Sequence, residues 1–355
     1  MKNMNRVIIV TYKEPYIIRE IKALVESLNY KIVEVITQKN LGRGKYGLGY
    51  GKVEEIKDLV KREKVDMIIY DDKLSVSKVY NLAKETQVPV VDRERLILNI
   101  FNERASTEEA KLQVKLAELR YELARAKEKV RLAKLGEQPG FYGLGKYEVD
   151  IYYRDLKRRM LNIMKKLKEV RSRRNLYRER RRDLGLKTVA LSGYTGAGKS
   201  TLFNLLAKEK RETDRGVFTT LSPLTRSIWV GGKKVLLLDT VGFIDRLPTY
   251  MIEAFKSTLE ELVYSNLVLL LIDLSDDEEE IVRKFNTCKG ILSDLKVNGS
   301  KLLYVLNKVD LVDDLKRRLE IFKDYEPKVI ISAKKGIGIE TLMKEMENHL
   351  VDRGP

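Results

Sequence analysis

The sequence predicts an α/β chain in three parts: an N-terminal parallel α/β domain, an antiparallel coiled-coil hairpin of two helices, and a second, larger α/β domain. Three observations support this prediction. Short β-branched runs alternate with segments of helical period at both ends of the chain, as in parallel sheets covered by helices. Two heptad seams separate these regions. In the third part, a glycine-rich loop lies between a strand and a helix. We place the domains at residues 1–100, 101–185 and 186–355.

Composition narrows the class of protein. The 69 basic residues exceed the 52 acidic ones and give a net charge of +17, which indicates a polyanionic partner such as nucleic acid. No apolar run reaches the ~18 residues that span a bilayer, so we expect no membrane association. A single cysteine and a single histidine exclude a disulfide and disfavour a Cys/His metal site. We expect a cytoplasmic protein that is monomeric when free.

The N-terminal part has predicted strands at 6–12, 32–36, 65–70 and 88–91, with helices at about 16–28, 53–64 and 75–86. After the second strand, Gly42, Gly44 and Gly47 have the G-x-G-x-x-G spacing of a dinucleotide site. That fingerprint belongs after the first strand of such a fold. We therefore favour a flexible basic loop, in possible contact with RNA, over a second nucleotide site.

The middle part is predicted as a helical hairpin. One seam runs from Leu112 to Ala133, a second from Leu156 to Val170, and a glycine-rich tip at 136–147 joins them. Residues 154–182 hold 14 Lys and Arg against 3 Asp and Glu. Few of these charges can pair at helical spacing, so the surplus indicates an external anion, most simply nucleic acid. The candidate RNA-binding residues are Lys146, Arg173, Arg174, Arg180, Arg181 and Arg182.

The third part begins with a strand that leads into G-x-x-x-x-G-K-S, residues 193–200. Such a loop curls around a polyphosphate, with backbone N–H groups pointing inward and a helix N-terminus beside it. Lys199 would reach the β- and γ-phosphates, and Ser200 would ligate Mg²⁺. Further strands are predicted at 235–238, 267–272, 302–306 and 328–331 in a buried parallel sheet, and a last helix at 338–350.

Three more motifs follow these strands. Asp239 and Gly242 form D-x-x-G, where the carboxylate would hold Mg²⁺ through water and the glycine amide would contact the γ-phosphate. Asn307, Lys308 and Asp310 form N-K-x-D, whose carboxylate can accept two hydrogen bonds from guanine but not from adenine. Ser332, Ala333 and Lys334 follow the last strand, where backbone amides can meet the guanine O6. Together these motifs predict a Ras-like P-loop GTPase domain.

Thr220 lies where the first switch must be, and its hydroxyl would close over Mg²⁺ only while a γ-phosphate is present; Thr219 is the alternative. The position after D-x-x-G is Phe243, which cannot orient water as a glutamine would, so slow intrinsic hydrolysis is expected. Arg215 could supply a charge in cis, but a solvated loop arginine is the simpler interpretation.

The expected GTP contacts are Gly193, Tyr194, Thr195, Gly196, Ala197, Gly198, Lys199, Ser200, Thr201, Phe218, Thr219, Thr220, Leu221, Asp239, Thr240, Val241, Gly242, Asn307, Lys308, Asp310, Ser332, Ala333 and Lys334. Of these, Ser200, Thr220 and, through water, Asp239 are expected to hold Mg²⁺. Lys199, Thr220 and Gly242 are expected to act in catalysis.

From about residue 40 onward, the chain resembles the HflX family of translation-associated GTPases. The resemblance rests on FNERASTEEAKLQVKLAELR at 101–120, on the phosphate loop, on FTTLSP at 218–223 and on DTVGF at 239–243. It implies that Thr220 is the switch threonine, that unaided turnover is slow, and that GTP/GDP and the rRNA of the large ribosomal subunit are partners. The basic hairpin resembles the family's rRNA-contacting arm.

The chain departs from the family pattern at three places: Gly196 replaces an asparagine, the hairpin tip reads GLGKYEVD, and the extra C-terminal domain of many bacterial members is not expected here. The predicted function is a GTPase of translation, ribosome rescue or ribosome biogenesis. The alternative is a GTP-gated adaptor or assembly factor with incidental hydrolysis. A third interpretation, an ATP-driven RNA remodeller using the N-terminal glycine loop, ranks below both.

Overall fold

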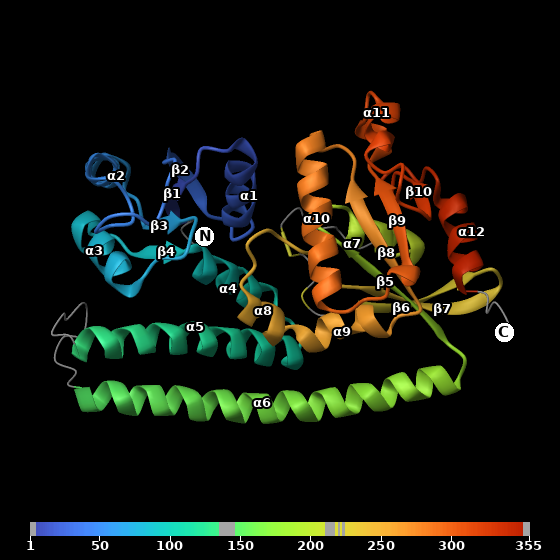
Figure 1. Cartoon of the computed structure of the whole chain (residues 1–355), viewed down its shortest axis with the longest axis horizontal. Helices are drawn as coiled ribbons and strands as arrows, with labels where there is room; N and C mark the ends of the chain where they lie inside the picture. The colour runs from blue at the N-terminus through green and yellow to red at the C-terminus, as the bar shows by residue number, and fades with distance from the viewer. Residues whose placement is uncertain (1–4, 135–145, 210–216, 219–220, 222–223, 351–355) are drawn as a thin grey trace. The chain divides into compact units, whose positions relative to one another are not determined.

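The computed structural model describes residues 5–134, 146–209, 217–218, 221 and 224–350. The chain forms two compact units, Met1–Lys168 and Glu169–Pro355, each built on its own sheet (Figure 1). Helix α6 begins in the first unit and ends in the second. The predicted α/β class is confirmed, while the division into three domains at residues 100 and 185 stays a prediction.

The first unit has a four-stranded parallel sheet in the order β2-β1-β3-β4. Its strands are β1 (Arg6–Thr11), β2 (Lys31–Thr37), β3 (Met67–Tyr70) and β4 (Val90–Asp92), and its helices are α1 (Pro15–Glu26), α2 (Tyr50–Glu63), α3 (Val76–Thr86), α4 (Arg93–Arg104), α5 (Glu108–Lys134) and the first part of α6 (Lys146–Asp183). Helices α3 and α4 begin at side-chain caps, Ser75 and Asp92, each worth ~1 kcal/mol.

The glycine-rich loop after β2 packs into the core of this unit. Leu41, Tyr46 and Leu48 are buried in the same cluster as the β1 and β3 side chains. The Tyr70 hydroxyl accepts the N–H of Gly42 at 2.7 Å and donates to the Gly47 carbonyl at 2.7 Å. Burial raises the pKa of Tyr70 to about 12, so its hydroxyl stays protonated and can donate. The loop, which the sequence predicts to be flexible and basic, is therefore anchored to the sheet through Tyr70.

The predicted helical hairpin consists of α5 and α6, which lie side by side in Figure 1. In the first unit, Leu119 and Ala126 of α5 are buried against Leu156 of α6, with Leu123 and Met160 packed beside them. These residues belong to the two predicted seams, so this part of the seam is confirmed. The glycine-rich tip at 136–147 falls almost entirely outside the described residues, as do the side chains at the tip end of both helices.

The second unit has a six-stranded sheet in the order β10-β9-β8-β5-β7-β6. Its strands are β5 (Lys187–Gly193), β6 (Leu224–Val230), β7 (Lys233–Asp239), β8 (Leu267–Asp273), β9 (Leu302–Asn307) and β10 (Lys328–Ile330); its helices are α7 (Lys199–Leu206), α8 (Thr249–Ala254), α9 (Lys256–Tyr264), α10 (Glu278–Asp294), α11 (Leu315–Glu320) and α12 (Ile339–Leu350), with 3₁₀ turns η1 (Gly299–Lys301) and η2 (Val309–Leu311).

The expectation of a wholly parallel second sheet was wrong at its edge. Strand β6 pairs antiparallel with β7 from Leu224↔Asp239 to Val230↔Lys233. The two-residue link Gly231-Gly232 has φ +55 and +75, which suits a tight hairpin. Along β6, Ile228 is buried while the neighbouring Trp229 is 69% exposed, the alternation of an edge strand with one covered face.

None of the helices in the described part of the chain combines the length and the apolar composition needed to cross a bilayer.

Candidate functional site

The loop between β5 and α7 is shaped by two glycines in backbone conformations that other residues rarely adopt. Gly193 has φ +142 and Gly198 has φ +95. A Cβ on Gly193 would lie 2.4 Å from the Leu271 carbonyl oxygen, and one on Gly198 would lie 2.3 Å from the Asn307 amide nitrogen. A side chain at either position would push the loop away from its neighbours, so both glycines are required by close approach.

Lys199, the first residue of α7, holds its ammonium group inside this loop. Nζ donates to the carbonyl oxygens of Gly193 at 3.0 Å and of Tyr194 at 2.8 Å, and the side chain is buried. Burial lowers the pKa of Lys199 from its ordinary value, although the negative charge of Asp239 opposes that shift. The cation is thus held where a phosphate group could replace the two carbonyl oxygens as its partner.

The Ser200 hydroxyl and the Asp239 carboxylate, both of the oxygen type that Mg²⁺ prefers, lie together beside the phosphate loop. The Ser200 hydroxyl donates to Asp239 Oδ2 at 3.0 Å, because the register of β5 and β7 brings Asp239 opposite Leu191 at the carboxyl end of the sheet. One hydroxyl and one carboxylate, completed by water and phosphate oxygens, form a donor set that Mg²⁺ accepts. Among the described residues no group of three or more His, Cys, Asp or Glu side chains is placed to hold a metal ion.

The D-x-x-G segment touches the phosphate loop directly. A Cβ on Gly242 would lie 2.9 Å from Lys199 Nζ and 2.9 Å from Thr195 Cγ2, so a side chain at this position would displace one of these groups. Thr195 N–H donates to the Phe243 carbonyl at 2.8 Å, and Phe243 N–H donates to the Gly193 carbonyl at 3.1 Å. The phenyl ring of Phe243 is 2% exposed, so this residue provides packing and presents no polar group to a water molecule.

Tyr194 connects the phosphate loop to the residues after Phe243 and to α10. Its hydroxyl accepts the Asp245 N–H at 2.9 Å. Asp245 in turn accepts the Thr287 hydroxyl at 2.6 Å and pairs with Arg283, both on α10. The Arg283 guanidinium carbon lies 5.8 Å from the centre of the Tyr194 ring. One aromatic side chain of the loop is therefore shared between two other parts of the domain.

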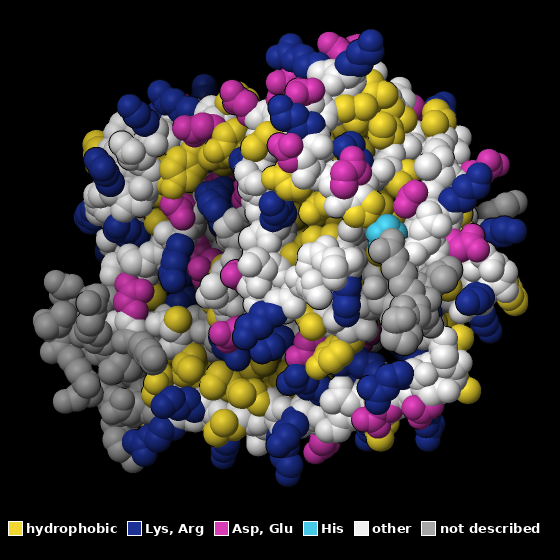
Figure 2. All heavy atoms as spheres, turned by 45° about the vertical axis from the view of Figure 1, so that its right-hand side comes forward, with side chains coloured by type: hydrophobic (Ala, Val, Ile, Leu, Met, Phe, Trp, Pro, Cys, Tyr) yellow, Lys and Arg dark blue, Asp and Glu magenta, His cyan; other side chains and the backbone are white. Residues whose placement is uncertain are grey.

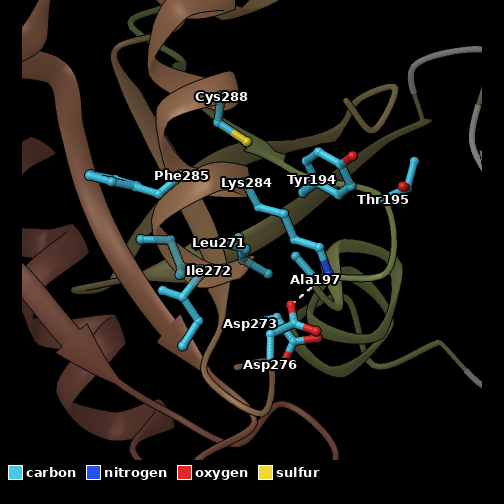
Figure 3. A pocket seen from close by; sticks show the side chains of 11 residues that line it. Tyr194, Thr195, Ala197, Leu271, Ile272, Asp273, Asp276, Lys284, Phe285 and Cys288 are labelled. Atoms are coloured by element: carbon cyan, nitrogen blue, oxygen red, sulfur yellow. Dashed lines mark hydrogen bonds and ion pairs between the residues drawn. The ribbon is translucent and has the colours of Figure 1, made fainter. Parts of the chain in front are cut away.

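Behind the loop lies a small hollow of about 10 Å³. Figure 3 shows Tyr194 and Cys288 on one side of it and Asp273 with Asp276 on the other, where Lys284 reaches Asp276 at 2.7 Å. Burial, and then the charge of Asp273, raise the pKa of Asp276. This volume holds about one water molecule, so the hollow is not large enough for a nucleotide.

Asn307 joins the phosphate loop to the loop after β10. Its Nδ2 donates to the Ala197 carbonyl at 2.8 Å, and its Oδ1 accepts the Ala333 N–H at 2.9 Å. Both bonds are buried and both ends of the amide are used. The N-K-x-D asparagine is consequently a bridge within the site.

The other residues of the two guanine motifs lie around this bridge. Lys308 has φ +65 and pairs with Asp273, and Asp310 lies in the turn η2, partly exposed. Ser332 is buried and its hydroxyl accepts the N–H of Lys335 at 3.1 Å. Lys334 is exposed. The two motifs thus lie at one edge of the sheet, as predicted. The side chain of Asp310 has no described contact with the other residues of these motifs.

Some predicted contacts have their side chains committed elsewhere. Thr240 is fully buried and its hydroxyl donates to the Leu191 carbonyl at 2.7 Å. Val241 and Ala197 are also buried, whereas Gly196 is exposed with open space around its Cβ position. Thr201, on α7, is partly exposed. For Thr240, Val241 and Ala197, only backbone groups are therefore offered to a ligand.

The predicted first switch is described at two positions only. Phe218, with φ +55, is 2% exposed and Leu221 is 1% exposed, so both side chains pack into the domain. Thr219, Thr220 and the candidate cis arginine Arg215 lie outside the described residues.

The basic helix α6 differs from expectation in one respect, because acidic residues of the chain neutralise part of its charge. Glu261 of α9 lies 2.6 Å from Arg178 and 3.9 Å from both Arg174 and Arg181, and Glu260 lies 2.5 Å from Arg171. The inference that the whole surplus awaits an external anion was therefore wrong for these arginines. Sequence reasoning missed it because α9 is far from α6 along the chain.

The other candidates on α6 remain available. The guanidinium groups of Arg173, Arg180 and Arg182 are exposed and have no ion-pair or hydrogen-bond partner among the described residues. The side chain of Lys146 lies outside the described residues. On the face shown in Figure 2, Lys and Arg side chains are interspersed with Asp and Glu.

Sequence reasoning also missed Asp245 and Arg283, which contact Tyr194, and Thr287, which donates to Asp245. None of the three belongs to a recognisable motif; Arg283 and Thr287 lie on α10 among other charged and polar residues. The separation of 42 residues between Asp245 and Thr287 makes their contact a product of the tertiary fold.

Three family models match successive parts of the chain: "GTP-binding GTPase N-terminal" over residues 16–102, "GTP-binding GTPase Middle Region" over 104–181 and "50S ribosome-binding GTPase" over 188–308. GTPase HflX of Methanocaldococcus jannaschii is 45% identical over 338 residues, which cover 94% of this chain and 83% of that one. This chain belongs to the HflX family of GTPases.

Further relatives support the same family assignment. GTPase HflX of Thermococcus kodakarensis is 40% identical over 92% of this chain and 73% of its own length. Among solved structures, a GTP-binding protein from Sulfolobus solfataricus, crystallised with GDP, is 27% identical with a TM-score of 0.55, over 99% of this chain and 100% of that one. As an HflX-family member with a P-loop GTPase domain, the chain binds guanine nucleotides and hydrolyses GTP.

Proposed function

We propose that this HflX-family GTPase holds GTP and Mg²⁺ at the carboxyl edge of its second sheet and acts on the large ribosomal subunit in translation, ribosome rescue or ribosome biogenesis. The observation that carries the ribosome part is a set of exposed guanidinium groups on α6 that have no partner in the described part of the chain. Three such groups, Arg173, Arg180 and Arg182, lie on one helix. Their charge is of the sign that an RNA backbone requires.

The residue roles follow from the contacts at the loop. Lys199 would exchange its two loop carbonyls for phosphate oxygens, and Gly242, which leaves room beside Lys199, would offer its N–H to the γ-phosphate. Ser200 and Asp239 would hold Mg²⁺, which when bound offsets negative charge on the phosphates. Thr220 would complete this set in the GTP state. Asp310 would select guanine over adenine.

Phe243 gives a reason to expect a partner in hydrolysis. Its ring is buried and offers no hydrogen bond, so no group at this position orients the attacking water. We propose that the ribosome supplies or orders the missing group. The name of the family model that matches residues 188–308, "50S ribosome-binding GTPase", supports the same partner. We propose a cytoplasmic location, because the ribosomal partner would be met there.

The same residue favours a second candidate function. If no partner replaces the missing group, the chain would act as a GTP-gated adaptor or assembly factor that binds RNA in one nucleotide state and hydrolyses GTP only incidentally. The buried Phe243 is equally consistent with this slow switch.

The test is GTP turnover by the full chain with and without large ribosomal subunits from the same source, at low and at physiological salt. Stimulation of at least about tenfold, equivalent to ~1.4 kcal/mol of barrier, supports the ribosome-stimulated enzyme. Binding without stimulation supports the adaptor. Absence of binding in both nucleotide states would overturn the ribosomal assignment. Lys199→Ala is the control, because it should abolish turnover under every condition.

A further inference from the structure

The second unit contains a hollow of about 420 Å³ at the base of α6, well away from the phosphate loop. It is bounded by the last turns of α6, the start of β5, and the end of α9 with the following residue Asn266. Lys187 and Thr188 open β5 on this side, whereas the phosphate loop begins where β5 ends, at Gly193. At ~3.3 Å per residue, seven residues of strand separate the two places by ~20 Å.

The lining combines cations with one exposed aromatic ring. Four cationic side chains line the hollow: Arg178, Arg181, Arg182 and Lys187. Glu179 and Glu261 are the only carboxylates among the described lining residues. Tyr264, the last residue of α9, is 55% exposed although it borders the hollow. A large aromatic side chain left open beside several cations is the combination that binds nucleotides of single strands, since the ring stacks a base and the cations neutralise phosphates.

The ring is held in position before any ligand arrives. The Arg178 guanidinium carbon lies 4.2 Å from the centre of the Tyr264 ring. Arg178 is itself held by Glu261, with its Nη2 2.6 Å and its Nε 3.1 Å from Glu261 Oε1. A stacking surface that is already oriented loses little conformational entropy on binding.

Asn266 adds a directed donor. Its side-chain oxygen accepts the N–H of Thr188 at 2.9 Å and the Thr188 hydroxyl at 3.2 Å. Because the N–H of Thr188 can only donate, the oxygen end of this amide is assigned by chemistry. The amide nitrogen is the end left for a base edge or a phosphate.

We propose that this hollow binds one unpaired nucleotide of an RNA strand, with the base on Tyr264 and the phosphate beside Arg182. The volume lies within the ~300–1,000 Å³ typical of sites for small ligands, and RNA readers act on splayed, unpaired bases. The inference deepens the proposed function and rests on it for the source of the RNA. Because the hollow shares no lining residue with the phosphate loop, RNA and GTP can be bound at once.

The test measures binding of the full chain to a labelled single-stranded RNA of about ten nucleotides, within the ~4–16 that one site covers. Inorganic polyphosphate serves as a probe with charge but without bases. Tyr264→Leu should weaken RNA binding at least about fivefold and leave polyphosphate binding unchanged, because only the RNA loses a stacking partner. Tyr264→Phe keeps the ring and should bind RNA like the parent.

A charge-matched pair makes the test independent of Tyr264. Arg182→Gln and Arg180→Gln each remove one exposed arginine, but only Arg182 lines the hollow. Arg182→Gln should weaken RNA binding at least about threefold more than Arg180→Gln, because only Arg182 lies where the phosphate would bind. Variants are compared only where GDP affinity and the urea unfolding midpoint equal those of the parent.

The proposal is overturned by equal loss of RNA and polyphosphate binding in Tyr264→Leu, or by equal RNA affinity for Arg182→Gln and Arg180→Gln. Displacement of the RNA by free nucleoside monophosphate at similar concentration would also overturn it, by assigning the hollow to a free nucleotide. If the parent binds the oligonucleotide as expected but no ribosomal subunit, the proposed ribosomal function fails and the hollow stands. If the parent binds ribosomal subunits but Tyr264→Leu binds RNA like the parent, the proposed nucleotide site fails and the ribosomal function stands.

Discussion

The hydroxyl of Tyr194 accepts the backbone N–H of Asp245 at 2.9 Å. This bond joins the phosphate loop to the segment that follows D-x-x-G, and Asp245 continues the connection to Thr287 of α10 at 2.6 Å. A change in the position of the Asp245 segment would therefore reach both the loop and α10. In GTPases the segment after D-x-x-G is one that rearranges with the γ-phosphate.

Tyr194→Phe should loosen this connection while keeping the ring. The lost bond is worth ~0.5–1.5 kcal/mol, so the Asp245 amide should exchange its hydrogen roughly two- to tenfold faster in hydrogen-exchange measurements. GDP affinity should change little, because the phosphate contacts come from the backbone. Tyr177→Phe, which alters an exposed tyrosine of α6, is the control. Unchanged exchange at Asp245 would contradict the connection.

Asp310→Asn should move base preference from guanine toward xanthine. An amide cannot accept both guanine donors, and an unmet polar group in such a site costs heavily. GTP affinity should fall at least about a hundredfold, measured by displacement of a fluorescent guanine nucleotide, while XTP affinity rises. Asp313→Asn, an exposed aspartate three residues on, should leave both affinities as they are. Parent-like GTP binding by Asp310→Asn would remove Asp310 from the site.

Gly242→Ala should slow GTP hydrolysis while leaving GDP affinity nearly unchanged. The added methyl group would lie 2.9 Å from Lys199 Nζ and from Thr195 Cγ2, so either the Lys199 ammonium or the D-x-x-G segment is displaced from its place beside the γ-phosphate. GDP affinity should stay within about threefold of the parent, whereas GTP turnover should fall at least about tenfold, equivalent to ~1.4 kcal/mol. Calorimetric titration and phosphate release measure the two quantities. An active variant would mean that the Gly242 amide is not needed in hydrolysis.

Glu261→Gln should destabilise the second unit and make RNA binding more dependent on salt. The carboxylate is largely buried and lies 2.6 Å from Arg178; its loss leaves that guanidinium with a weaker partner and should lower the free energy of unfolding by about 2 kcal/mol in urea titrations. The released positive charge should steepen the dependence of RNA affinity on salt. Glu179→Gln removes an equal charge from an exposed position on α6, and its unfolding free energy should match the parent's to within ~0.5 kcal/mol.

Cys288 should resist alkylation in the folded protein. It is 3% exposed, and burial raises the pKa of its thiol to about 12. At pH 8 the reactive thiolate is then roughly a thousandfold scarcer than for a free cysteine. Iodoacetamide should react slowly with the native chain and rapidly in urea, and because the chain has one cysteine mass spectrometry reads this site alone. Equal rates in both conditions would show that α10 opens readily.

The sequence predicts those parts of the site that short stretches of backbone determine. The glycines of the phosphate loop, Lys199 with Ser200, and Asn307 each lie within a motif at a strand end, and the register of parallel strands brings these ends to one edge. The antiparallel strand β6 was missed although Gly231-Gly232, between two apolar runs, is a hairpin signal.

Other features depend on contacts between distant segments. Glu260 and Glu261 are two acidic residues in a short helix until the fold places them beside the arginines of α6, 83 to 89 residues away. The same is true of Asp245 and Tyr194, 51 residues apart. Residue type and spacing record the chemistry of a local loop, but they do not record which distant carboxylate reaches which guanidinium.

The amide of Asn307, which is bonded at both ends, has a consequence for the kinetics of nucleotide exchange. Because the side chain is hydrogen-bonded to both Ala197 and Ala333, opening the phosphate loop or the base loop alone would break a buried hydrogen bond at a cost of ~0.5–1.5 kcal/mol, so the two openings are coupled. Release of GDP would then proceed as one concerted opening, with a single rate, rather than as stepwise departure of base and phosphates. An exchange factor that pulled on either loop would act on both.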